Sequence, residues 1–287
     1  VQDSVPIGTV HNNDAVIFYD FRNDRAIQLA TPFIRGAGFE SFERVRTPKS
    51  VKVVTMTQYK DDFDVPVAYQ SLVLANTLGE VISAHGWRQW RIAEKEKEAH
   101  VTNFFNGGRL TPFSGERRDI VSSRMMRGQE YIEHPEMSAK KILDAVHEKM
   151  ADDARLYVIN FANPDMIAHT GGLEATEKAI TVVDDCLRQL VGVIMKDQGN
   201  AIIITADHGN AEELVDPLTG KGDTQHSTQS VPAIFIHSAL LRTGGTGRNV
   251  RMLAEESPRG TLVDIAPTIL TLLGMSVPSE MTGSSLT

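Results

Sequence analysis

Short runs of aliphatic and β-branched residues alternate along the chain with longer amphipathic segments. This alternation is typical of βα units built around a largely parallel sheet. The runs predict strands at residues 15–19, 51–56, 89–93, 156–161, 201–205 and 231–236. The amphipathic segments predict helices at residues 72–85, 138–150, 173–196 and 262–273. The pattern therefore predicts an α/β fold in which helices flank the sheet.

The predicted helix at 173–196 shows the clearest periodicity. Apolar residues recur in it every three or four positions, at Ile180, Val183, Leu187, Leu190 and Ile194. This spacing predicts one apolar stripe that faces a sheet. Cys186 lies off that stripe, so we interpret this cysteine as a bystander and not as a nucleophile.

The stretch at 60–66 is acidic, contains proline and lies between a predicted strand and a predicted helix. We interpret it as the link between a small early piece and a larger later domain. The chain is accordingly divided into residues 1–72 and residues 73–287. Neither an internal repeat nor a low-complexity tract occurs in the sequence.

Charge and cysteine content narrow the functional classes. Lys and Arg total 29 against 37 Asp and Glu, which gives a formal charge of −8 and makes nucleic acid or an anionic membrane a poor generic partner. No apolar run is long enough for a membrane span. The single cysteine cannot form an intrachain disulfide, which fits a reducing compartment and predicts a cytoplasmic protein.

The strongest chemical signal is the segment IIITADHGN at residues 202–210. An apolar strand delivers Asp207 and His208 to its carboxyl end, where functional crevices of α/β sheets lie. The alternative is an Asp that caps the next element and a His that packs against it.

A second predicted strand is followed by Asp165 and His169. Their spacing of four residues places both side chains on one face of a helix, which suits joint coordination of one cation. A solvated pair would show the same spacing.

The third candidate is His226, in a polar loop just before the strand at 231–236. A lone loop histidine is usually solvated, but three Asp and His clusters at strand ends supply together the ligands that Mn²⁺ or Zn²⁺ prefers. The joint interpretation is a site for phosphoryl transfer that holds two metal ions.

Basic residues are needed for an anionic substrate. Arg22 and Arg25 follow a predicted strand three residues apart, and at a helix start they could bind a carboxylate or phosphate. The alternative is a surface network with Asp20 and Asp24. Lys97 belongs to a charge run that usually means a solvated face, and composition does not separate it from Lys95.

These segments, in this order, closely resemble the cofactor-independent phosphoglycerate mutases of the alkaline phosphatase superfamily. The resemblance runs from about residue 5 to the C-terminus and rests on five segments, FRNDRA at 21–26, AEKEKEAHVTNFFNGG at 93–108, NFANPDMIAHTG at 160–171, TADHGNAE at 205–212 and DIAPTIL at 264–270. It implies an alkaline-phosphatase-like, largely parallel sheet flanked by helices at 73–287. Residues 1–72 would be the tail of a second, smaller α/β domain that grips the substrate.

The resemblance also implies an activity and its cofactors. The family interconverts 2-phosphoglycerate and 3-phosphoglycerate in glycolysis through a phosphoserine, with two Mn²⁺ ions or, in some members, Mg²⁺, Co²⁺ or Zn²⁺. By motif position, Lys97 would neutralise charge during phosphoryl transfer. Residues that match the family's metal ligands are Asp165, His169 and His226 for one ion and Asp207 and His208 for the other. Those that match its substrate ligands are Arg22, Arg25 and Lys97.

The sequence departs from the family's pattern in two respects. Asn23 replaces a proline, which leaves both arginines in place. The family's first segment carries a metal-binding Asp and the nucleophilic Ser, and neither motif occurs in these 287 residues. We therefore expect this chain to be inactive alone and to need the N-terminal portion of the same enzyme as a partner, the complete enzyme being a monomer.

Two other functions remain open at this point. In a metal-dependent phosphomonoesterase, water would accept the phosphoryl group, and free phosphate would be the sole product. In a non-catalytic metal- or phosphate-binding fragment, the ligands would bind without turnover.

Overall fold

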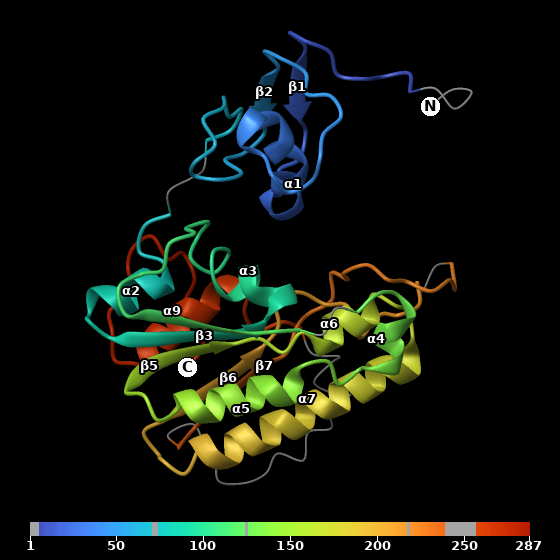
Figure 1. Ribbon diagram of the computed structural model, residues 1–287. Coiled ribbons are helices and arrows are strands. Elements are labelled where there is room, and N and C mark those ends of the chain that lie inside the picture. The colour runs from blue at the N-terminus through green and yellow to red at the C-terminus, as the bar shows by residue number, and fades with distance from the viewer. Residues whose placement is uncertain (1–5, 71–73, 124–125, 217–218, 239–256) are drawn as a thin grey trace. The chain divides into compact units, whose positions relative to one another are not determined.

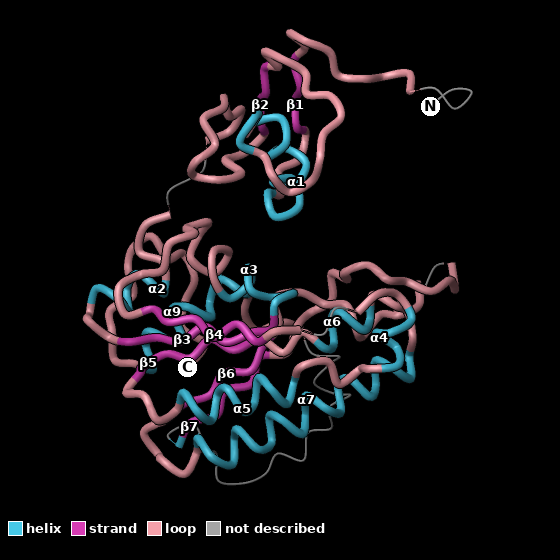
Figure 2. Tube along the Cα trace, viewed as in Figure 1, coloured by secondary structure: helices cyan, strands magenta, loops and turns pink. Residues whose placement is uncertain are grey.

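The computed structural model describes residues 6–70, 74–123, 126–216, 219–238 and 257–287. The chain forms two compact units, Val1–Val73 and Leu74–Thr287. Figures 1 and 2 show their helices and strands. Each unit is described by itself.

The first unit contains a two-stranded parallel ladder of β1 (Ala15–Phe18) and β2 (Lys52–Thr55). The helix α1 (Asn23–Ile34) follows β1, and a short 3₁₀ turn, η1 (Gly36–Gly38), follows the helix. The small side chains Ala26 and Ala30 let α1 pack closely on the buried rings of Tyr59 and Phe63. Because Phe63 belongs to this core, residues 60–66 are part of the unit and do not form the expected link.

The second unit is built on a three-stranded parallel sheet. Its central strand β3 (Arg88–Glu94) pairs with β4 (Glu116–Val121) on one side and with β5 (Ala154–Ile159) on the other. A separate antiparallel ladder joins β6 (Ala201–Thr205) and β7 (Ala233–His237). The predicted strands are confirmed, the prediction missed β4, and β7 departs from the parallel pattern.

Helices cover both faces of the three-stranded sheet (Figure 1). On one face, α5 (Ala139–Lys149) and α7 (Leu173–Ile194) contribute Ile142, Val146 and Leu190 to a core with the strand residues Trp90 and Ile92. On the other face lie α2 (Leu78–Ala84) and α9 (Ile265–Leu272). The other helical elements among the described residues of this unit are η2 (Lys95–Lys97), α3 (Glu98–Val101), α4 (Gln129–Glu133), α6 (Asn163–Ala168) and η4 (Leu262–Asp264).

The buried face of α7 differs from the predicted stripe. Cys186 is 2% exposed and belongs to the core, whereas Ile180 is 45% exposed. The buried positions include the small residues Ala175 and Ala179, which let the helix approach its neighbours closely. The prediction counted only large apolar residues, and it therefore placed the buried stripe of α7 wrongly. The interpretation that Cys186 is no nucleophile fits its burial, because a buried thiol is out of reach of a substrate.

The helix predicted at 72–85 begins later than expected, since α2 starts only at Leu78. Positions 72 and 73 of that prediction lie outside the described residues.

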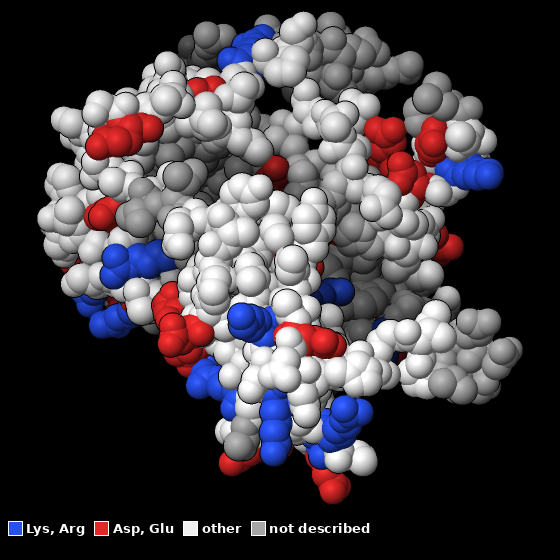
Figure 3. Space-filling model, turned by 90° about the horizontal axis from the view of Figure 1, so that it is seen from above, with Lys and Arg blue, Asp and Glu red and all other residues white. Residues whose placement is uncertain are grey.

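In the part of the chain that the structure describes, no helix is both long and apolar enough to cross a membrane. Basic and acidic side chains are interspersed on the face that Figure 3 draws.

Candidate metal centre

Two of the candidate ligands come from α6, the short helix that follows β5. Pro164 occupies its first turn, where a missing backbone N–H costs no hydrogen bond. Asn163 anchors the helix start by donating its amide to the Pro135 carbonyl at 2.8 Å. Asp165 follows in the first turn, and His169 caps the end of the helix. Their four-residue spacing therefore brings both side chains to one side of α6.

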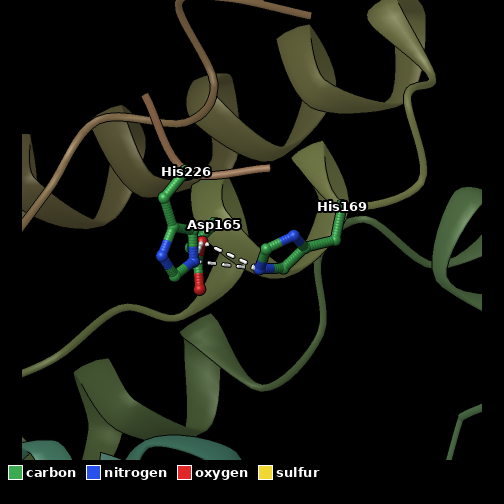
Figure 4. Close-up of side chains that lie close together, drawn as sticks. All are labelled: Asp165, His169 and His226. Carbon is green, nitrogen blue, oxygen red and sulfur yellow. Dashed lines mark hydrogen bonds and ion pairs between the residues drawn. The ribbon is translucent and has the colours of Figure 1, made fainter. Parts of the chain in front are cut away.

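The third ligand, His226, reaches the same place from the loop before β7 (Figure 4). Its Nε2 lies 3.3 Å from Asp165 Oδ1 and 3.2 Å from His169 Nε2. The His169 Nε2 atom is itself 3.3 Å from Asp165 Oδ1. Two ligand atoms from α6 and one from a loop more than 50 residues later in the sequence thus face one another.

These separations fit a bound metal ion. Ligand atoms at about 2.1 Å from one tetrahedral cation are roughly 3.4 Å apart, close to the distances found here. The His169 ring is oriented by its other nitrogen, Nδ1, which lies 2.7 Å from the Thr224 carbonyl oxygen. Such an outer contact fixes the tautomer that leaves Nε2 available for a metal. Asp165, His169 and His226 are the described residues whose ligand atoms form a metal-sized group.

Asp207 and His208 follow β6 and lie beside this group. The His208 ring stacks on the His226 ring, with centroids 3.6 Å apart and an interplanar angle of 20°. The two segments are joined by a bridge in which the Ser227 N–H donates to the Gly209 carbonyl at 2.9 Å. Asp207 Oδ2 lies 3.6 Å from His208 Nε2, and the Asp207 side chain is exposed. His208 therefore adjoins the first group of ligands, and Asp207 lies next to His208.

Lys97 is the basic residue of this centre. Its ammonium donates to Asp165 Oδ2, and its side chain is only 7% exposed. Lys95, which composition could not separate from it, is 70% exposed and pairs with Glu98. The η2 turn thus directs one lysine inward and the other into solvent. The charge run is a solvated face for Lys95 but not for Lys97.

The pKa values in the centre follow from these contacts. Burial of Asp165 raises its pKa, but hydrogen bonds from Lys97 and Asn210 and the charges of Lys97 and His169 outweigh burial and lower it to about 2. Burial and the nearby His208 lower the pKa of His226 against the opposing charge of Asp165. At neutral pH the centre therefore combines an ionised carboxylate with a neutral imidazole, the forms that bind metals.

Arg22 and Arg25 lie in the first unit at the start of α1, as the sequence predicted. Arg22 caps the helix and donates its backbone N–H to Asp20 Oδ1 at 2.9 Å, and Arg25 occupies the first turn. Sequence reasoning assigned no role to Asn210, which the structure places against Asp165. Its position directly after the Asp-His-Gly turn is the signal that could have indicated it.

Comparisons with known proteins agree with this geometry. The family model described as "Metalloenzyme superfamily" matches residues 68–277. The model described as "BPG-independent PGAM N-terminus" matches residues 1–61.

Curated relatives are similar along the whole chain. The 2,3-bisphosphoglycerate-independent phosphoglycerate mutase of Thiobacillus denitrificans is 46% identical over 288 residues, which cover 99% of this chain and 52% of the relative. That of Salinibacter ruber is 48% identical over 278 residues, 96% of this chain and 50% of the relative. The chain thus spans about half the length of the curated relatives it matches.

A solved structure shares the fold. Leishmania mexicana phosphoglycerate mutase, crystallised at low cobalt concentration, matches with a TM-score of 0.81 and 28% sequence identity. The match covers 99% of this chain and 52% of the Leishmania chain.

We expect His169→Ala to weaken Mn²⁺ binding strongly, because it removes one of three converging ligand atoms. Calorimetric titration of the variant against the parent protein measures the change. The matched control is His147→Ala, an exposed histidine on α5 that should leave binding unchanged. Equal Mn²⁺ affinity of the His169→Ala variant and the parent would contradict the assignment of this centre.

We also expect Mn²⁺ affinity to depend on pH in a particular direction. Since the pKa of His226 is lowered from 6.5, its imidazole stays neutral down to pH values below that figure. Protons should therefore compete with Mn²⁺ for the His226 ring mainly below about pH 6.5, and affinity should fall steeply there. Calorimetry across this range and NMR titration of the metal-free His226 ring test this expectation. A His226 midpoint above its ordinary value would contradict it.

Proposed function

The chain belongs to the Metalloenzyme superfamily, and we propose that it is part of a phosphoglycerate mutase that interconverts 2-phosphoglycerate and 3-phosphoglycerate. The observation that carries the proposal is the convergence of Asp165, His169 and His226 next to the buried Lys97, in a chain 46% identical to a curated mutase. A phosphate ester is an anion, and this centre offers both metal ligands and a fixed ammonium for it.

The metal centre would hold two divalent ions, and we propose Mn²⁺ because a mixed carboxylate and imidazole set suits that ion. Asp165, His169 and His226 would bind one of them, and Asp207 and His208 would contribute to the second site. Two such ions supply electrostatic stabilisation of the entering and leaving oxygens in phosphoryl transfer. The chemistry proposed for the complete enzyme passes through a phosphoserine.

Lys97 would neutralise the charge of the phosphoryl group during transfer. Its ammonium is held by Asp165 Oδ2, so its position is fixed before substrate arrives. Preorganised positive charge stabilises a phosphoryl-transfer transition state without a reorganisation cost at the moment of reaction. We propose that Lys97 has this role because it is the buried lysine of the charge run.

Arg22 and Arg25 would hold the carboxylate and phosphate of the glycerate. Guanidinium groups bind such anions through two parallel hydrogen bonds, and both residues lie where a helix N-terminus adds its own attraction for an anion. In this proposal, residues 1–72 belong to the substrate-gripping domain and residues 73–287 to the phosphatase-like domain.

The proposal includes a partner segment, the N-terminal portion that family members carry. In the described part of the chain, β5 pairs only with β3 and β6 only with β7. Each of these strands thus has an edge whose backbone groups can accept a further strand. The complete protein would be a monomer that acts in glycolysis. We propose a cytoplasmic location because the single cysteine, Cys186, is a free buried thiol, as is usual in a reducing compartment.

We expect Arg22→Ala in the complete enzyme to lower kcat/KM while Mn²⁺ binding stays unchanged. Loss of a bidentate charged contact costs on the order of 2 to 3 kcal/mol, a fall of roughly 30- to 140-fold. Steady-state kinetics and calorimetry provide the two measurements. Arg46→Ala, an exposed arginine of the same unit, is the matched control. An unchanged kcat/KM would remove Arg22 from the active site.

We expect these 287 residues alone to lack mutase activity, because no serine here matches the nucleophile's motif. The measurement is a mutase assay with and without Mn²⁺, on a sample whose intact mass is that of the chain, 31.6 kDa. The complete enzyme is the positive control. Interconversion by the chain alone would contradict this expectation, and free phosphate as the sole product would favour a phosphomonoesterase.

A further inference from the structure

Asn210 touches the metal centre without being one of its ligands. Its side chain is 4% exposed, and its amide Nδ2 donates to Asp165 Oδ1 at 2.7 Å and to the Asp165 carbonyl at 3.3 Å. Asp165 Oδ1 is the same oxygen that faces His169 and His226. A carboxylate oxygen has two lone pairs, so one can accept from Asn210 while the other binds a cation.

Asn210 is itself held from the opposite side by Glu212. The Asn210 backbone N–H donates to Glu212 Oε2 at 2.9 Å. The other carboxylate oxygen, Oε1, accepts the hydroxyl of Ser227, the residue directly after His226. Glu212 therefore ties the turn after β6 to the loop that carries His226.

Gly209 shows how closely these groups meet. A Cβ atom built there would clash with Glu212 Oε1 and Ser227 Oγ. No side chain fits at this position unless the contact between Glu212 and Ser227 opens. A side chain at the glycine of the Asp-His-Gly turn would therefore push Glu212 and Ser227 apart.

We propose that Asn210, held by Glu212, is a positioning residue that couples the Asp207–His208 turn to the cluster of Asp165, His169 and His226. Its amide orients the Asp165 oxygen, and the contact of Glu212 with Ser227 sets the position of His226. The inference rests on the metal centre of the proposed function. It states that Asn210 and Glu212 raise the metal affinity of that centre by positioning its ligands.

The test is the Asn210→Ala variant of the complete protein, titrated with Mn²⁺ by calorimetry and followed by electron paramagnetic resonance. We expect Mn²⁺ affinity to fall by about 10- to 100-fold, the usual effect of removing a group that orients a ligand. We also expect a changed Mn²⁺ spectrum, with thermal unfolding of the metal-free protein close to that of the parent. Asn200→Ala, an exposed asparagine of the same unit, should leave affinity and spectrum unchanged.

A second pair of variants separates positioning from folding. Glu212→Gln keeps the shape of the side chain and one carbonyl acceptor, so it should retain more Mn²⁺ affinity than Glu212→Ala. Parent affinity and an unaltered spectrum in Asn210→Ala would overturn the inference. If Asn210→Ala does not fold, equal affinities of the two Glu212 variants and the parent would overturn it.

Failure of the proposed function gives a different result. A parent protein that binds Mn²⁺ but does not interconvert phosphoglycerates would contradict the function and leave the role of Asn210 intact. A parent protein that does not bind Mn²⁺ would contradict both.

Discussion

The carboxylate of Asp165 is the point at which the functional end of the second unit is held together. Its Oδ2 accepts from Lys97, and its Oδ1 accepts from Asn210 and faces His169 and His226. A charge this well shielded from water is costly unless opposite charges and donors surround it. Four segments, namely η2, α6, the turn after β6 and the loop before β7, each supply one of these contacts. Loss of the carboxylate would leave a buried ammonium unpaired.

The two oxygens of this carboxylate serve different partners. The lysine is on Oδ2, whereas both histidines are on Oδ1, so a cation can bind between the histidines without displacing Lys97. A divalent ion and an ammonium on one carboxylate leave the centre with a positive net charge. With an ion bound there, an acidic protein with a formal charge of −8 would have a local concentration of positive charge beside Asp165. Hydrogen bonds from Lys97 and Asn210, with the charges of Lys97 and His169, already lower the pKa of Asp165 to about 2, so its carboxylate is ionised before any cation binds.

The sequence predicted those features that depend on local spacing. The strand at 201–205 and the placement of Asp165 and His169 on one side of a helix follow from short-range patterns, and the structure has both. β4 was missed because its first four residues, at 116–119, are charged and hide the strand pattern. The difference between Lys95 and Lys97 depends on a 3₁₀ turn, and the contact of Asn210 with Asp165 joins residues 45 positions apart. Such contacts are set by tertiary pairing and leave no periodic signal.

The direction of β7 explains why His226 completes the centre. In a parallel sheet, the loop before a strand lies at the amino edge, away from residues that follow a neighbouring strand. Because β7 runs antiparallel to β6, Ala233 at its start pairs with Thr205 at the end of β6. The segment before β7 and the segment after β6 therefore lie at the same end of the ladder. The bridge of Gly209 to Ser227 extends that pairing toward the ligands and stacks His226 on His208. The candidate metal centre thus depends on a strand pair that, among the described strands, departs from the parallel pattern of the fold.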